Sequence, residues 1–91
     1  MERISPLRKR IDEIDERILP FLKERVDVCE TIGAIKREHS IPVTDPSREN
    51  ELNKRLRERA TNLGLSPHHI EAVYREIVGM CKYVQEDNAK T

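Results

Sequence analysis

The feature that most constrains this chain is an apolar pattern that runs from Ser5 to Glu38. Apolar residues recur there at spacings of three and four, in two heptad columns. The columns contain Ile4, Ile11, Ile18, Arg25 and Ile32, and Leu7, Ile14, Phe21, Val28 and Ile35. Residues three and four apart lie on one face of a helix, so the pattern predicts one long amphipathic helix whose only charged column member is Arg25.

This helix is too long for the globule that its own chain can build. About 34 residues at roughly 1.5 Å each extend about 50 Å. A compact chain of 91 residues has a radius of gyration near 12 Å and is only about 30 Å across. The apolar face continues over the overhang and needs a cover. Because the commonest cover is a second copy related by a two-fold axis, we expect an intertwined, all-α homodimer.

Two shorter helices are expected after the long one. Each begins with a capping side chain followed by a proline, which is favoured at the first helical position: Asp45 with Pro46, and Ser66 with Pro67. Gly64 is a typical residue just beyond a helix end. The residues between the first two helices, 39–44, are expected to form a turn.

Serine and proline also mark the first helix. Ser5 is expected as its N-cap, before Pro6. Pro20 removes a backbone hydrogen bond in the middle of the pattern and should bend the helix there. The pattern stays in phase beyond Pro20, so we expect one bent helix. The sequence thus predicts a single all-α domain over residues 1–91, a three-helix protomer with a long first helix.

Composition argues against several classes of function. Lys plus Arg equals Asp plus Glu, 17 each, so no overall basic field would hold nucleic acid. No run approaches the roughly 18 apolar residues that span a membrane, and the N-terminal residues show no apolar signal segment. Cys29 and Cys81 have apolar neighbours, and we interpret them as reduced residues of the core or of a site, not as a disulfide framework. These features predict a cytoplasmic protein.

Charges on the apolar faces are the informative ones. Four cations and two anions are expected to point toward one interior, which gives a local excess of 4 − 2 = +2. They are Arg8, Arg25, Lys36 and Arg48, and Asp45 and Glu49. Buried charges need counter-charges. A small dianion that carries a hydroxyl group would complete such a cluster.

Each residue alone also has a simpler interpretation. Arg25 could cover apolar surface with its stem and keep its head in water, and Arg48 and Glu49 could be surface charges at a helix start. His68 and His69 have no Cys, Asp or Glu at metal-ligand spacing, so no metal or other cofactor is expected. No nucleophile–base arrangement or Gly-rich phosphate loop is present in the sequence. Such a site is expected to bind, orient and stabilise charge.

Three segments resemble a known family. They are LRKRIDEID (7–15), ILPFLKERVDVCETIGAIK (18–36) and IPVTDPSRE (41–49). With their spacing they resemble the AroQ class of chorismate mutases, from about Leu7 to Gln85. The resemblance implies a three-helix protomer that dimerises through its first helix. It also implies an isomerase that converts chorismate to prephenate, without a cofactor, in phenylalanine and tyrosine biosynthesis.

The resemblance implies a role for each candidate residue. An intramolecular Claisen rearrangement needs the substrate held in its reactive conformer and negative charge stabilised on the breaking ether oxygen. By this resemblance, Arg25 and the partner's Arg8 bind the substrate carboxylates, and Lys36 and Gln85 donate to the ether oxygen. Glu49, with Asp45 nearby, holds the ring hydroxyl. Arg48 and Cys81 line the site near the ring carboxylate.

The chain departs from the family pattern at two positions. Cys81 stands where the family often has serine, and Pro20 where it usually has a helix former. An isochorismate pyruvate lyase on the same fold would use much the same cationic pocket, and a dimerisation or regulatory module with a vestigial site would share the fold. Asp45 beside Glu49 favours a hydroxyl placed as in chorismate. Chorismate mutase is therefore the expected function, and the lyase is the nearest alternative.

Overall fold

Three helices account for most of the chain. The computed structural model describes residues 2–90, with side chains described over residues 2–86. Its helices are α1 (Ser5–Glu38), α2 (Pro46–Asn62) and α3 (Pro67–Lys90), and no strand occurs in this range. The predicted all-α protomer with a long first helix is confirmed. No helix within residues 2–90 has both the length and the apolar character needed to cross a membrane.

The helix starts follow the capping residues in two of three cases. The Asp45 side chain accepts a hydrogen bond from the Arg48 backbone N–H (3.1 Å) at the start of α2. Ser66 does the same for the His69 N–H (3.3 Å) at the start of α3. The prediction for α1 is wrong by one residue, because its N-cap is Ile4, with no side-chain cap. Pro at the next positions favours the helix, so α1 can begin without a polar cap.

The end of α2 shows why a glycine stands at position 64. The N–H of Gly64 donates to the carbonyl of Thr61 (3.1 Å), and the N–H of Leu65 donates to the carbonyl of Ala60 (2.8 Å). This double closure requires a left-handed residue at Gly64, whose φ is 74°. Glycine adopts that conformation without a steric penalty. The turn sends α3 back across α1.

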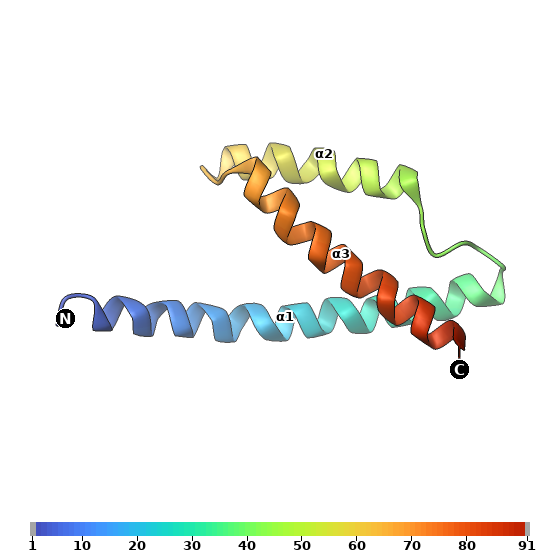
Figure 1. Cartoon of the computed structure of the whole chain (residues 1–91), viewed down its shortest axis with the longest axis horizontal. Coiled ribbons are helices and arrows are strands. Elements are labelled where there is room, and N and C mark those ends of the chain that lie inside the picture. Colours follow the sequence, from blue (N-terminus) through green and yellow to red (C-terminus); the bar gives the residue numbers. More distant parts are fainter. Residues whose placement is uncertain (1, 91) are drawn as a thin grey trace.

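Helix α1 passes through Pro20 as one continuous helix. Figure 1 shows α1 as an unbroken rod, with no sharp bend visible at this point in that view. The prediction of one helix is therefore confirmed, and the expected bend is at most gentle. Pro20 removes a single backbone hydrogen bond, and the rest of the 34-residue helix tolerates this loss.

Helix α3 packs against both of the other helices and holds them together. It crosses the C-terminal half of α1 and meets α2 near the α2–α3 turn, whereas the N-terminal half of α1 projects as an arm that neither α2 nor α3 covers (Figure 1). The protomer measures 56 × 29 × 14 Å, with a radius of gyration of 16.7 Å. A compact chain of this length would have a radius near 12 Å. The predicted overhang is real.

The core of the protomer is small. Among the described side chains only Cys29, Leu52, Ala60 and Gln85 are buried, together with Gly33 on α1. The accessible surface is 7520 Å², whereas a compact folded chain of this mass exposes about 5,500 Å².

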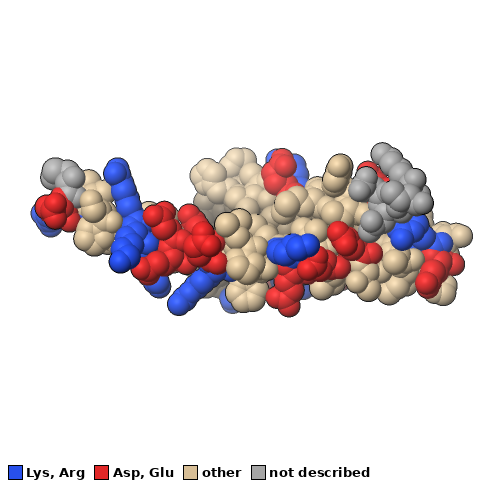
Figure 2. Space-filling model, turned by 90° about the horizontal axis from the view of Figure 1, so that it is seen from below, with Lys and Arg blue, Asp and Glu red and all other residues tan. Residues whose placement is uncertain are grey.

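The exposed excess includes the apolar face of the arm. Leu7 is 65% exposed, Ile11 56% and Phe21 71%. Acidic and basic side chains lie side by side on the outer face of the arm (Figure 2). The arm is therefore an amphipathic helix whose apolar face is left uncovered by the side chains of residues 2–86.

Candidate active site

A cavity of about 420 Å³ lies where the C-terminal half of α1, the start of α2 and the last turns of α3 meet. Seven of the eight predicted site residues line it: Arg25, Lys36, Asp45, Arg48, Glu49, Cys81 and Gln85. The eighth, Arg8, lies 17 positions before Arg25 on α1, which corresponds to about 26 Å along the helix. Arg8 cannot reach the cavity of its own chain.

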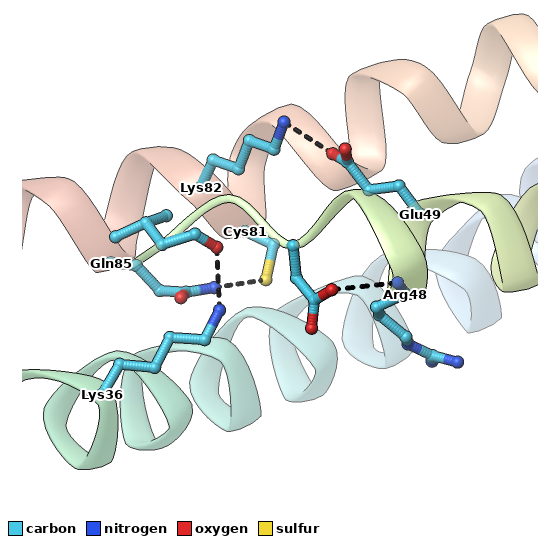
Figure 3. A network of polar contacts seen from close by, with 8 residues as sticks. Lys36, Arg48, Glu49, Cys81, Lys82 and Gln85 are labelled. Atoms are coloured by element: carbon cyan, nitrogen blue, oxygen red, sulfur yellow. Dashed lines mark hydrogen bonds and ion pairs between the residues drawn. The ribbon is translucent and has the colours of Figure 1, made fainter. Parts of the chain in front are cut away.

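Lys36 reaches across the cavity to the connection between α1 and α2. Its Nζ donates a hydrogen bond to the backbone carbonyl of Val43 (2.8 Å). The side chain is half-buried, and its head lies beside Gln85 (Figure 3). The bond fixes the ammonium group at the cavity wall, where it can donate to a ligand.

Gln85 is the most deeply placed polar side chain of the site, at 4% exposure. Its Nε2 donates to the Cys81 sulfur (3.0 Å), and its Oε1 is buried with no hydrogen-bond partner among the described residues. A buried polar atom without a partner is costly in a finished structure and is common where a ligand binds. The amide oxygen is therefore an unused acceptor, and the amide nitrogen donates only to sulfur, a weak acceptor that a ligand could replace.

Gly33 makes this position of Gln85 possible. A Cβ atom at Gly33 would lie 2.8 Å from the Gln85 Cγ and 3.0 Å from its Cα. Only glycine lets α1 and α3 approach so closely at this point. The close approach places the Gln85 amide in the cavity.

Cys29 of α1 and Cys81 of α3 form a disulfide, with their Cα atoms 5.3 Å apart. The prediction of two reduced cysteines is wrong. The two residues lie on the facing sides of helices that cross here, at a Cα separation that a disulfide requires. The bond leaves Cys81 without an S–H group, so in this form it accepts from Gln85 and cannot donate to a ligand. The pairing also removes the cysteine-based argument for a reducing compartment.

The remaining sulfur contact lies on α1. Arg25, which is half-buried, approaches the Cys29 sulfur with its Nη1 (3.9 Å). Sulfur is a weak acceptor. The guanidinium therefore keeps nearly all of its donor capacity for the cavity.

The stretch from Asp45 to Glu49 forms the wall of the cavity that belongs to α2. The Asp45 carboxylate caps the helix. The Arg48 guanidinium pairs with Glu51 (2.7 Å) and is exposed. Glu49 pairs with Lys82 of α3 (2.5 Å), each side chain about one-third exposed. In Figure 3 Glu49 and Lys82 face each other, while the Arg48 guanidinium points away from Gln85.

Lys82 is the site residue that sequence reasoning missed. It lines the cavity next to Cys81, three residues before Gln85. Its position beside two candidate residues on α3 was the available signal, but the apolar stripe alone does not show which flank of that helix faces α2. The cavity lining carries four cations, Arg25, Lys36, Arg48 and Lys82, and two anions, Asp45 and Glu49. The excess of 4 − 2 = +2 is thus present in one chain, with Lys82 in place of Arg8.

Comparison with known proteins gives a consistent relationship. The family model described as chorismate mutase type II matches residues 7–86. The bifunctional chorismate mutase/prephenate dehydratase of Aquifex aeolicus is 37% identical over 84 residues, which cover 89% of this chain and 23% of that protein. The chorismate mutase of Methanocaldococcus jannaschii is 39% identical over 57 residues, covering 63% of this chain and 58% of that protein. The matched region is thus less than two thirds of either relative.

A solved structure agrees with the fold. A conserved hypothetical protein from Pyrococcus furiosus superposes with a TM-score of 0.73 at 29% identity, over 93% of this chain and 97% of that one. The family match spans all of α2, most of α1 and α3, and every residue that lines the cavity. The chain belongs to the chorismate mutase type II family.

Proposed function

We propose that the chain is a chorismate mutase, an isomerase that rearranges chorismate to prephenate in phenylalanine and tyrosine biosynthesis. The observation that carries the proposal is the cavity, which bears a net charge of +2 and is lined by seven of the eight residues to which the family resemblance assigns a role. A dianionic substrate matches that charge. The nearest alternative, an isochorismate pyruvate lyase, would need a cavity of similar charge.

The rearrangement needs no proton transfer and no covalent intermediate. Its barrier falls when the substrate is held in the reactive conformer and when charge on the breaking ether oxygen is stabilised. Arg25 offers a planar fork of donors for a carboxylate. Its long contact to Cys29 is weak enough to be exchanged for the substrate.

Lys36 and Gln85 supply donors for the ether oxygen in this proposal. Lys36 Nζ is held by the Val43 carbonyl and retains two further N–H donors. The Gln85 Nε2 is engaged only by sulfur, and a neutral amide donates over a broad pH range. Two donors aimed at one oxygen give the electrostatic stabilisation that the transition state requires.

Glu49 and Asp45 serve the ring hydroxyl. A carboxylate has two acceptor oxygens, and Lys82 pairs with one of those of Glu49, Oε1. The other oxygen can accept from a hydroxyl group.

Arg48 would have to leave Glu51 and turn inward to contact the substrate, which its exposed position allows at small cost.

The site is completed in a homodimer. The protomer exposes roughly 2,000 Å² more than a compact chain of its mass, an area in the range that each partner of an obligate homodimer buries. The exposed apolar residues of α1 lie along most of its length. Two copies of α1 that cross in antiparallel fashion would cover both arms.

This arrangement also brings the missing arginine to the cavity. In an antiparallel pair centred near Pro20, the partner's Arg8 lies beside the α1 segment between Arg25 and Lys36. It would raise the excess charge of the site from +2 to +3 and give the second carboxylate a fork of donors.

Chorismate and isochorismate, each supplied alone to the purified protein, test the proposal. We expect loss of chorismate with formation of prephenate, and a fall of about 10²–10³-fold in kcat for Lys36→Ala, as for other lost transition-state donors. Pyruvate release from isochorismate without prephenate from chorismate would establish the lyase instead. No turnover of either substrate, or turnover unchanged in both Arg25→Ala and Lys36→Ala, would favour a dimerisation module with a vestigial site.

A further inference from the structure

The ion pair between Lys82 and Glu49 adds a constraint that the proposed reaction does not require. Lys82 Nζ lies 2.5 Å from Glu49 Oε1, and both residues line the cavity. Both side chains are about one-third exposed, so the pair contributes little to stability. Its effect on a ligand bound to Glu49 is larger, because Lys82 places a positive charge next to the acceptor carboxylate.

We infer that Lys82 is a specificity-determining residue of this site: it makes Glu49 an acceptor for a neutral hydroxyl group and disfavours an ammonium group at the same ring position. The inference rests on the proposed function, which assigns the ring hydroxyl to Glu49. A carboxylate without a nearby cation would attract an ammonium group more strongly than a hydroxyl group. The paired lysine removes that advantage by occupying the carboxylate charge.

Geometry sets the size of the effect. A group that hydrogen-bonds to the second oxygen of Glu49 lies about 2.8 Å from it, and therefore about 5 Å from Lys82 Nζ. Two unit positive charges at that separation, in a partly exposed site, repel by an energy that corresponds to roughly tenfold in affinity or more. A hydroxyl group carries no charge and escapes this penalty.

The ratio of two substrates isolates this effect from the general attraction of the cavity for dianions. The probes are chorismate and its analogue with an amino group in place of the ring hydroxyl. Contacts to the shared carboxylates and to the ether oxygen cancel in the ratio of the two kcat/KM values. Only groups near the substituent remain, and Lys82 is the cation bonded to its acceptor.

The test compares Lys82→Met, Lys82→Arg and a matched control, Lys54→Met. Lys54 is exposed on α2 and does not line the cavity. We expect Lys82→Met to shift the kcat/KM ratio toward the amino analogue by roughly tenfold, and Lys82→Arg and Lys54→Met to keep the wild-type ratio within about twofold. Circular dichroism and thermal unfolding of each variant verify that it folds.

The outcomes separate this inference from the proposed function. If the wild type converts chorismate and Lys82→Met leaves the ratio unchanged, the inference is refuted and the proposed function stands. If Lys54→Met shifts the ratio as far as Lys82→Met, the effect is general charge and the inference is again refuted. If the wild type converts neither compound, the proposed function fails and takes the inference with it.

Discussion

The close approach of α1 and α3 at Gly33 gives the sharpest link between packing and the proposed chemistry. In Gly33→Ala the new Cβ would lie 2.8 Å from the Cγ of Gln85 and 3.0 Å from its Cα. Rotation of the side chain can relieve the first contact. The second involves the backbone of α3, so the helices must separate by roughly 0.8 Å to restore an ordinary carbon–carbon contact near 3.8 Å.

Two opposing terms decide the stability of this variant. Overpacking of a close contact costs about 1–3 kcal/mol, whereas alanine in place of glycine inside a helix gains about 1 kcal/mol. We expect the free energy of unfolding to fall by about 1 kcal/mol. The displacement of Gln85 by roughly 0.8 Å should also lower kcat by about 10- to 100-fold, because misplacement of a catalytic donor by about 1 Å greatly slows a reaction.

Gly79→Ala is the matched control, a second glycine inside a helix. A Cβ atom at Gly79 meets no atom within 4 Å in the protomer, so this variant should gain up to about 1 kcal/mol and keep its activity. Unfolding is followed by circular dichroism at one fixed protein concentration, since an oligomer's stability depends on concentration. A Gly33→Ala protein as stable and as active as Gly79→Ala would refute the reasoning.

Two further predictions concern the disulfide and the arm. The Cys29–Cys81 bond closes a loop of 52 residues, so reduction should lower the free energy of unfolding by about 4 kcal/mol. Dithiothreitol should therefore lower the melting temperature of the wild type but leave that of a Cys29→Ser/Cys81→Ser variant unaffected. A wild type whose melting temperature does not respond to dithiothreitol would contradict the pairing. Ile11 is 56% exposed in the protomer, so Ile11→Glu should be harmless to a monomer but should dissociate the dimer, as measured by sedimentation velocity. Glu16→Ala, on the outer face of α1, should leave the dimer intact. A wild type that sediments as a monomer at micromolar concentration would refute the dimer.

Much of this architecture could be read from local signals in the sequence. The starts of α2 and α3 follow from Asp45 and Ser66, whose side chains bond the backbone of their own first turn, and the end of α2 follows from Gly64. Such bonds depend on only a few neighbouring residues. The length of α1 follows in the same way from its repeating apolar columns.

The features that the sequence did not reveal depend on how α3 is rotated against its neighbours. Cys29 and Cys81 lie 52 positions apart, and only the crossing of α1 and α3 brings their sulfurs together. Lys82 was missed for the same reason, because an apolar stripe shows which face is buried but not which flank meets Glu49. The uncovered arm could be foreseen because its length alone exceeds the size of the globule.

Subunit complementation between Arg8→Ala and Lys36→Ala tests the central claim, a chorismate mutase site completed by an arginine from the other protomer. Each variant alone should be nearly inactive. When equal amounts are unfolded and refolded together, about half of the dimers are mixed, and each mixed dimer contains one intact site of two. We expect the mixture to recover about one quarter of the wild-type rate of chorismate loss. A mixture no more active than its components would place Arg8 in its own chain's site, or in none, and would contradict the account.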